Sequence, residues 1–265
     1  MDFTEKVILG RTSLKVGRIG ISSSYGAKAD VFEEAFDHGF NYLTWGTFIK
    51  GDSKEMKKAI RNLIQRGKRD EMVISLFTYA HDPLLTRYFL KKRIKALGVN
   101  HIDILLLGYF PKVPSPRILD GARKLKEQGM VRYIGISGHH RKMFRDLKNV
   151  SDIDVIHVRY NPAHRGAEKD VFPFFNYEDR PGIVSFTATR WGKLLNQKNM
   201  PRGEKPLLAA DCYRYVLSNP FVDVCMMGVR SREQLHENLA KIEIGPLNTE
   251  EKLHIEKLGE YVYNH

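Results

Sequence analysis

The fold is decided by the stretch "LKKRIKALGVNHIDILLLG", residues 90–108. Its first part is a cationic segment with helical patterning, and its second part is a short apolar run that contains Leu105, Leu106 and Leu107. A short apolar run without polar alternation is typical of a parallel strand that is buried on both faces. Gly108 stands where this strand is expected to end. The stretch therefore predicts one helix–strand unit of a parallel sheet.

The same alternation extends through the whole chain. β-rich runs occur at 18–22, 41–45, 72–77, 103–107, 133–137, 154–158, 182–186 and 222–227. Helical patterns lie between and after them, at 29–38, 54–66, 83–97, 115–128, 140–149, 206–218, 230–241 and 248–263, while 166–176 is less clear. A parallel sheet of eight strands that alternate with helices closes into a barrel. We therefore expect an α/β fold, a (β/α)8 TIM barrel.

A short segment precedes the first of these strands. "VILGRTSLKVG" (7–17) has the pattern of a β-hairpin whose turn is Gly10 to Ser13, and such a hairpin would cap the lower end of the barrel. No Pro- or Gly-rich linker, internal repeat or low-complexity segment interrupts the chain. The prediction is one domain, residues 1–265.

Composition restricts the class of protein. The 265 residues are 42% hydrophobic and 28% charged, which is typical of a soluble globular protein. No apolar run approaches the ~18 residues of a membrane span, and "MDFTEKVILG" lacks the features of a signal peptide. Cys212 and Cys225 match no metal-binding spacing. We expect two reduced thiols in a cytoplasmic protein.

The net charge of +12 points to no macromolecular partner by itself. The lysines and arginines are spread over helical stretches such as 54–69 and 90–98, and no nucleic-acid-reading module is visible. We therefore expect a small-molecule ligand rather than a membrane or a nucleic acid. A cofactor that carries phosphate would use a few of these cationic side chains.

With its strands placed, the chain resembles the aldo-keto reductase superfamily over almost its whole length. The hairpin followed by "VGRIGIS" resembles the family's opening. Four further segments resemble the family in the same order, namely "LKKRIKALGVNHIDILLLG" (90–108), "KLKEQGMVRYIGISG" (124–138), "VRYNPAHRGAEKDVFPFF" (158–175) and "MMGVRSREQLHENL" (226–239). The resemblance implies a barrel that binds a nicotinamide cofactor and reduces carbonyl compounds.

Members of that family use a catalytic Tyr, Lys, Asp and His, and this chain matches none of the four. By resemblance, the Asp position is Thr44 and the Tyr position is Ile49, or Phe48 with a one-residue gap. The Lys position is Phe77 and the His position is Gly108. The loss is self-consistent, because a buried Asp without its Lys would be an unpaired charge that costs several kcal/mol.

Aromatic residues gather where the charged set is missing. Six of them fall near the carboxyl ends of predicted strands: Trp45, Phe48, Phe77, Tyr79, Tyr109 and Phe110. They would either plug the barrel mouth and complete the core, or form a cleft that holds a flat or apolar ligand by stacking. Tyr25 and Tyr109, each just beyond a strand end, are the candidates for a replacement proton donor.

The segment after the last strand resembles a cofactor site. Gly228 permits a tight turn, Ser231 and Gln234 have the spacing of a capping box, and the helix start favours phosphate. Arg230 and Arg232 would contact a 2′-phosphate of NADP(H), and by resemblance Gln234 and Asn238 would lie by the adenosine. The alternative is an ordinary capped amphipathic helix.

The nicotinamide end of the family's site is altered. Phe186 keeps the aromatic residue on which the ring stacks, and Ser137 matches a carboxamide-binding Ser. Gly138 replaces the neighbouring Asn, and His157 replaces a Gln, although His157 would equally serve as an ordinary barrel histidine. The adjacent His139 and His140 point in different directions and have no carboxylate partner, so no metal site is expected.

Three functions remain open from the sequence. The first is an NADP(H)-dependent oxidoreductase that works with a rebuilt site. The second is a non-catalytic pseudoenzyme that binds a nucleotide or an aromatic ligand. The third is a barrel recruited to other chemistry.

Overall fold

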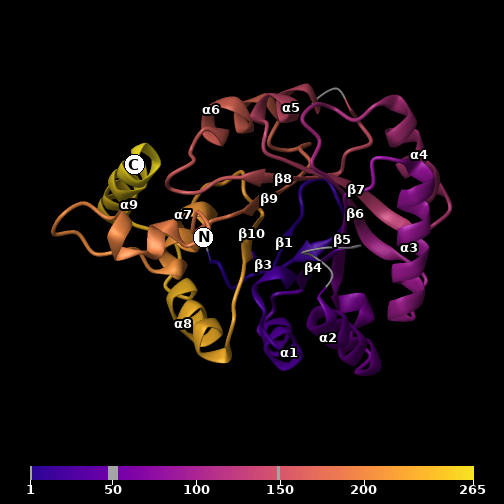
Figure 1. Ribbon diagram of the computed structural model, residues 1–265, viewed down its shortest axis with the longest axis horizontal. Coiled ribbons are helices and arrows are strands. Elements are labelled where there is room, and N and C mark those ends of the chain that lie inside the picture. Colours follow the sequence, from indigo (N-terminus) through magenta and orange to yellow (C-terminus); the bar gives the residue numbers. More distant parts are fainter. Residues whose placement is uncertain (1, 47–52, 148–149) are drawn as a thin grey trace.

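The computed structural model describes residues 2–46, 53–147 and 150–265, and within them eight parallel strands close into a barrel surrounded by helices (Figure 1). The barrel strands are β3 (Ile19–Ser22), β4 (Tyr42–Gly46), β5 (Val73–Thr78), β6 (Ile102–Gly108), β7 (Val131–Gly138), β8 (Val155–Arg159), β9 (Gly182–Phe186) and β10 (Val224–Met227). The predicted (β/α)8 barrel is confirmed, and each predicted strand overlaps the observed one.

Helices follow the strands and cover the outside of the barrel (Figure 1). They are α1 (Ala29–Asp37), α2 (Lys54–Gln65), α3 (Pro83–Leu97), α4 (Pro116–Glu127), α5 (Arg141–Asp146), α6 (Ala167–Asp170), α7 (Ala209–Leu217), α8 (Arg232–Ile242) and α9 (Thr249–Asn264). No helix in the described ranges is long and apolar enough to cross a membrane.

The observed helices differ from the predicted ranges mainly at their ends. Helix α7 begins three residues later than predicted, because the Leu207 amide bonds to the Leu194 carbonyl instead of joining a helix. Helix α5 ends at Asp146, and the last part of its predicted range lies outside the described residues. Residues 166–176 form only α6 and a 3-10 turn, Phe172–Phe174.

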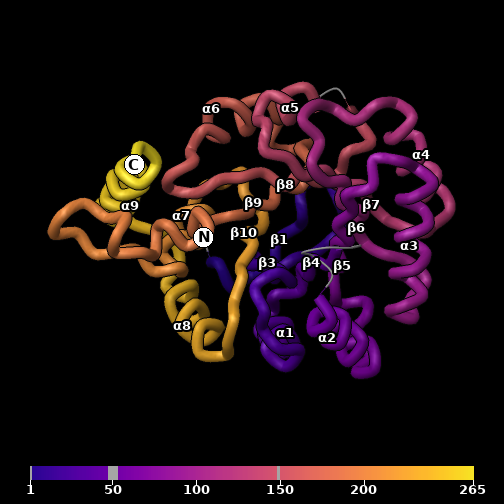
Figure 2. The backbone as a smooth tube through the Cα atoms, viewed as in Figure 1, coloured from indigo at the N-terminus to yellow at the C-terminus, as the bar shows by residue number. Residues whose placement is uncertain are grey.

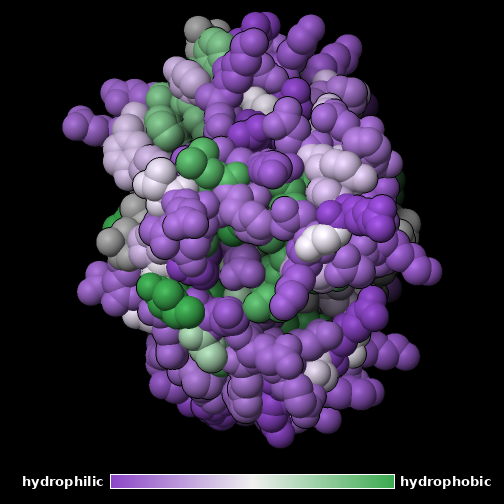
Figure 3. Space-filling view, turned by 90° about the vertical axis from the view of Figure 1, so that its left-hand side faces the viewer, coloured by the Kyte–Doolittle hydropathy of each residue, from purple (hydrophilic) through white to green (hydrophobic). Residues whose placement is uncertain are grey.

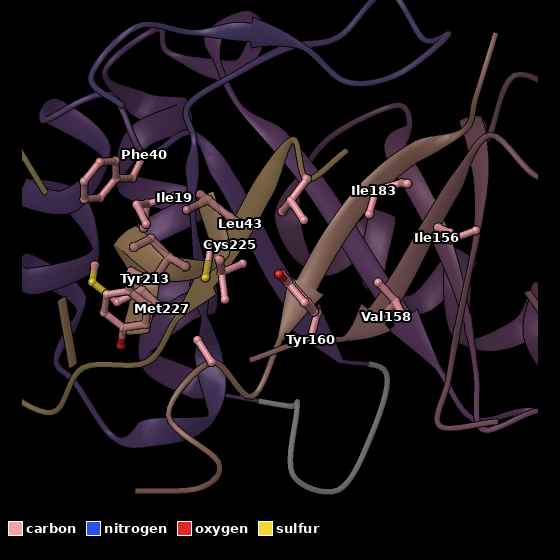
Figure 4. Close-up of a cluster of buried hydrophobic side chains, with 14 of the residues drawn as sticks. Ile19, Phe40, Leu43, Ile156, Val158, Tyr160, Ile183, Tyr213, Cys225 and Met227 are labelled. Atoms are coloured by element: carbon pink, nitrogen blue, oxygen red, sulfur yellow. The ribbon is translucent and has the colours of Figure 1, made fainter. Parts of the chain in front are cut away.

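The barrel closes between its last and first strands. β10 pairs with β3 in the register Cys225 with Ile19 and Met227 with Ile21, so the yellow strand lies beside the indigo one (Figure 2). Side chains on the outer surface of the barrel pack against the helices in one buried cluster (Figure 4). It includes Ile19, Leu43, Ile156, Val158, Ile183, Cys225 and Met227.

Inward side chains form a separate layer at the amino-terminal end of the barrel. Tyr42, Val73, Ile104, Val155, Val184 and Val224 meet there. The N-terminal hairpin, β1 (Val7–Ile8) and β2 (Lys15–Val16), adds Leu9, Leu14 and Val16 to this layer. The predicted hairpin is confirmed, and its apolar side chains plug this end of the barrel.

Three aspartates fix the amino-terminal ends of neighbouring strands. Asp103, Asp154 and Asp223 each accept a hydrogen bond from a backbone amide one strand back, at Ile74, Ile134 and Ile183 respectively. Each also pairs with a cation; for Asp223 this is the buried Arg180, at 2.7 Å for both of its oxygens. The charged groups at this end thus serve stability, which leaves the carboxyl end for a site.

Candidate functional site

A cavity of about 250 Å³ lies at the carboxyl ends of the strands. Every barrel strand contributes one inward residue to its lining: Ser22, Thr44, Phe77, Leu106, Ser137, His157, Phe186 and Met226. Within the described part of the chain, its lining contains no lysine, arginine, aspartate or glutamate. The cavity is therefore apolar and aromatic, with a few hydroxyl and imidazole groups.

Two of the positions predicted to lack catalytic groups pack directly against each other. A Cβ atom built on Gly108 would lie 2.4 Å from Cε1 and 2.6 Å from Cζ of Phe77. The phenyl ring therefore occupies the space that any side chain at 108 would need. Phe77 and Gly108 therefore form one structural unit. A larger residue at 108 would require the Phe77 ring to move, and the ring in this position requires a glycine at 108.

The other two positions predicted to lack catalytic groups are Thr44 and Ile49. Thr44 lines the cavity, and its hydroxyl donates to the Ile21 carbonyl at 3.2 Å. Ile49 and the alternative Phe48 lie outside the described residues.

A continuous series of rings forms one wall of the cavity. Centroid distances are 4.5 Å from Phe77 to Tyr79, 5.2 Å from Tyr79 to Tyr109 and 5.6 Å from Tyr109 to His139. The series ends where His139 meets Phe186 edge-on at 5.3 Å. These spacings are those of favourable aromatic pairs, so the wall offers a stacking surface for a flat ligand.

Backbone strain helps to position this wall. Tyr109 has a φ of 58°, a left-handed conformation that costs a bulky residue about 1–2 kcal/mol, and its side chain is 56% exposed. Trp45 contributes to the lining but is fully buried, and its Nε1 donates to the Ser53 carbonyl. Phe110 lies outside the lining and stacks on His81. The predicted aromatic residues thus divide between the cavity wall and the core around it.

His139 lies in this cavity, whereas its neighbour His140 is exposed at the start of α5. Burial, Arg159 and His140 lower the pKa of His139, so the ring is neutral at pH 7. Its Nδ1 atom is buried and has no hydrogen-bond partner within the described residues. The different surroundings of the two histidines agree with the prediction that they point in different directions, but the position of His139 in the site was not predicted.

No group of three or more potential metal-binding side chains occurs within the described ranges. A neutral imidazole with an unpartnered nitrogen offers a hydrogen bond to a ligand in the cavity.

His157 has a partner inside the barrel. Its Nε2 atom and the Tyr42 hydroxyl are 2.7 Å apart, and both side chains are buried. Desolvation lowers the pKa of His157 to about 3, so the ring stays neutral at physiological pH. The residue fits the interpretation as a barrel histidine and also reaches the cavity lining next to Ser137.

A second cavity, of about 740 Å³, adjoins the first. Tyr25, Thr187, Trp191 and Met226 line both cavities, so together they form one cleft from the barrel mouth to α8. On the face that carries α8 and α9, hydrophobic side chains are visible in a hollow surrounded by hydrophilic ones (Figure 3). Arg230, Gln234 and Asn238 all line this second cavity, as do Glu237 and Lys241, which the sequence analysis did not single out.

Ser231 caps the start of α8 as predicted, but the second bond of the predicted capping box goes to Arg230 instead of Ser231. The Ser231 hydroxyl accepts from the Gln234 amide, and the Gln234 side chain accepts from the Arg230 amide at 3.0 Å. Gln234 therefore has a structural role even though it lines the cleft. Ser231 is absent from the lining.

The two arginines at this helix start point in different directions. Arg230 lines the cleft, whereas the Arg232 guanidinium pairs with Asp30 and Glu34 of α1. The structure does not bring Arg232 into the cleft, because α1 provides two carboxylates on the other side of the helix.

Gly228 is required for close packing rather than for a left-handed turn. Its φ is not among the positive values, and a Cβ at this position would lie 2.1 Å from Cδ2 of Tyr25. The ring of Tyr25 therefore lies directly on the backbone at Gly228, between the two cavities. Burial raises the pKa of Tyr25 and nearby Arg230 opposes that shift, so the hydroxyl stays protonated at pH 7.

Gly138 is also closely packed. A Cβ there would meet Cε of Met143 at 2.8 Å and the Phe110 carbonyl oxygen at 3.2 Å. A side chain at this position would therefore require its neighbours to move.

The loop after β9 contains strained residues without glycine. Thr187, Arg190 and Trp191 have φ values of 58°, 51° and 54°. Each left-handed non-glycine residue costs of order 1–2 kcal/mol, and such strain clusters at ligand sites. Trp191 is 59% exposed and lies between the two cavities. No turn motif in the sequence indicated this geometry.

The fold and its cleft define a (β/α)8 barrel with an N-terminal hairpin and a site at the strand carboxyl ends. The Aldo/keto reductase family model matches residues 6–206, and the chain belongs to that family. Aldo-keto reductase YhdN of Bacillus subtilis is 23% identical over 98% of this chain and 94% of its own. L-galactose dehydrogenase of Arabidopsis thaliana is 22% identical over 88% and 86%.

A solved structure confirms the fold. The holo form of aldo-keto reductase AKR11C1 from Bacillus halodurans matches with a TM-score of 0.80 and 19% identity, covering 96% of each chain. The match to the family model confirms the superfamily resemblance found in the sequence.

Proposed function

We propose that this protein is an NADP(H)-binding oxidoreductase that works without the usual Tyr, Lys, Asp and His set. The observation that carries the proposal is the single cleft formed by the two cavities, which share Tyr25, Thr187, Trp191 and Met226. Such a cleft suits a ligand with two ends joined by a flexible link. Membership of a family whose named relatives include a reductase and a dehydrogenase supports the reaction class.

The side chains in the cleft fit the two ends of NADP(H). At the outer end, Arg230 offers a guanidinium for a 2′-phosphate, and Gln234 and Asn238 offer amides beside it. At the inner end, Phe186 offers a ring for stacking the nicotinamide, with Ser137 and His157 near it. When bound there, the cofactor would supply a hydride to the aromatic cavity.

The reacting carbonyl would then meet the groups that this cavity contains. His139 has the free Nδ1 atom, so in the N–H tautomer it would donate to the carbonyl oxygen as negative charge develops. Of the two predicted hydroxyl donors, Tyr109 has its ring centroid 5.6 Å from that of His139. Tyr25 lies against Gly228 and would instead contact the middle of the cofactor.

A second function is supported by a different observation. Phe77 fills the space above Gly108, and the described lining offers no charged group to stabilise an oxyanion. This arrangement favours a pseudoenzyme that holds a nucleotide or a flat aromatic ligand without turnover. A barrel recruited to other chemistry remains the third candidate.

Cysteine chemistry bears on the compartment. Cys212 and Cys225 are both free and buried, and burial raises the pKa of each thiol, so both are protonated and unreactive. Two unpaired thiols are consistent with the proposal of a cytoplasmic protein. We also propose that residues 1–265 function as one domain.

The experiment that decides among these functions is oxidation of NADPH in the presence of a broad carbonyl panel. We expect turnover above the blank, a large loss in His139→Phe, and little change in the matched control His140→Phe. Saturable cofactor binding without oxidation would support the pseudoenzyme. Absence of both at saturating concentrations would exclude NADP(H) and leave the recruited barrel or a pseudoenzyme for an aromatic ligand.

A further inference from the structure

A group of three arginines and one histidine lies at the barrel mouth, outside the lining of the cleft. We call it the arginine cluster and define it as Arg141, Arg159, Arg190 and His164. Arg141 begins α5, Arg159 ends β8, Arg190 belongs to the strained loop after β9, and His164 follows β8. No role predicted for the cleft uses any of them.

Arg159 connects this cluster with the aromatic cavity. Val155 and His157 on β8 both point into the barrel, and side chains alternate along a strand, so Arg159 projects to the same side one step nearer the mouth. Its register partner on β9 is Phe186, which lines the cavity. Within the described residues Arg159 makes no hydrogen bond and no ion pair. Burial, Arg141 and Arg190 all lower its pKa.

Arg190 contains an unsatisfied donor. Its Nη1 atom is buried and has no hydrogen-bond partner in the described part of the chain. The guanidinium lies over the ring of Tyr263 in α9, with Cζ 5.9 Å from the centroid. The same ring meets His164 edge-on at 5.4 Å. Tyr263 therefore holds Arg190 and His164 on one side of the cluster.

Among the described residues, one carboxylate pairs with these groups. Arg141 donates from Nε to Asp170 at 2.7 Å, and its guanidinium packs on the backbone at Gly166. The nearby Glu168 is already used, because it accepts from the Tyr160 hydroxyl. Burial, with Arg159, Arg190 and Arg141, lowers the pKa of His164 to about 4, so the cluster carries three guanidinium charges against one carboxylate.

Partly buried like charges without counter-charges are unfavourable unless an anion accompanies them. The cluster adjoins a cavity that suits a flat ring, and its free donors belong to guanidinium groups, which bind planar oxyanions well. We propose that the arginine cluster binds the anionic group, a carboxylate or a phosphate monoester, of a molecule whose flat part lies in the aromatic cavity. As a statement about substrate, this rests on the proposed function, but the binding itself requires no cofactor.

The test compares aldehydes that differ only in charge. The probes are 4-carboxybenzaldehyde, its uncharged methyl ester and 4-formylphenyl phosphate, titrated calorimetrically into the full chain without cofactor. We expect at least one of the two anions to bind about tenfold or more tightly than the ester, which corresponds to one or two charge-assisted hydrogen bonds. Whichever anion binds more tightly identifies the preferred group.

Variants assign the effect to the cluster. Arg159→Gln and Arg190→Gln should each remove most of the preference for the anion and leave binding of the ester unchanged. Arg61→Gln on α2 is the matched control, because it removes the same charge from an exposed position. Thermal melts establish whether each variant is folded. If one of the two arginine variants does not fold, the other is sufficient for the test.

Two results would overturn the proposal. The first is equal binding of anions and ester by the natural chain. The second is an anion preference that survives in both folded arginine variants. Titration of the same variants with NADPH separates the two proposals, since the cluster variants should keep the affinity of the natural chain for NADPH. A loss of NADPH binding equal to the loss of anion binding would assign the cluster to the cofactor and contradict the substrate-anion proposal.

Discussion

The two sides of the barrel mouth differ in the space and in the hydrogen-bonding atoms that their side chains offer to a ligand. On the side of β4 to β6, Phe77 fills the space over Gly108, and Thr44 bonds to a backbone carbonyl. On the side of β7 to β10, His139 and Arg190 have buried nitrogen atoms without hydrogen-bond partners among the described residues. The side of β4 to β6 is packed like a protein core, and we call it the filled side. The side of β7 to β10 has polar atoms that could bind a ligand, and we call it the open side.

On the proposed function, the fold has lost one set of groups and kept another. Two of the four positions assigned to the catalytic set, Phe77 and Gly108, form one apolar unit that contains no charge. The proposed cofactor end uses a helix start, a close glycine contact and a loop conformation, none of which involves that unit. Four predictions test whether the two sides are as separate as this comparison indicates.

The largest effect is expected from restoring a side chain on the filled side. Gly108→His should lower the free energy of unfolding by ~3 kcal/mol, because its Cβ would lie 2.4 Å from the Phe77 ring. Adding Phe77→Ala should recover part of that loss, and urea unfolding of the single and double variants measures the coupling. Additive effects would show that the two positions are not one unit.

The next effect concerns the open side. Arg230→Gln should weaken NADPH binding by about 30-fold, equivalent to ~2 kcal/mol, and should change NADH binding little, because only NADPH carries the 2′-phosphate. Arg232→Gln is the control, since its guanidinium pairs with α1 outside the cleft. Fluorescence titration with each cofactor measures both. Equal losses for the two cofactors, or a larger loss in Arg232→Gln, would refute the assignment.

The third prediction is that the free energy of unfolding depends on acidic pH through His157, which is buried inside the barrel. The folded-state pKa of His157, about 3, lies below the unfolded value of about 6.5, so the unfolded chain binds the extra proton between them. Stability from this group is complete above pH 6.5 and decreases as the pH falls, by ~1.4 kcal/mol per unit. His157→Gln cannot titrate and should flatten the acid side of the stability profile. An unchanged slope in urea unfolding at pH 6 and 5 would contradict the buried neutral imidazole.

The smallest effect is expected in the strained loop. Thr187 is β-branched and left-handed, so Thr187→Gly should raise the free energy of unfolding by ~1 kcal/mol. The matched control is Thr189→Gly in the same loop, whose φ is not positive and which should instead lose stability. Thermal melts compare the two. A destabilised Thr187→Gly would show that the loop is not strained at that residue.

The fold was predictable because strands buried on both faces leave continuous apolar runs, as in residues 104–107. The contact between Phe77 and Gly108 was not, since it joins two strands whose spacing in sequence carries no sign of it. Arg230 and Arg232 are equivalent in the sequence, and only the position of α1 separates them. The free nitrogen of His139 and the left-handed residues 187, 190 and 191 likewise depend on packing that no local pattern encodes.

We propose that the open side holds NADP(H) and that the filled side takes no part in binding it. The decisive measurement is a crystal structure of the full chain grown with saturating NADPH. We expect the nicotinamide ring on Phe186 with its C4 atom towards the cavity that contains His139, and the 2′-phosphate at Arg230. A cleft without cofactor at saturating concentration, or a cofactor bound with its phosphate away from Arg230, would contradict it.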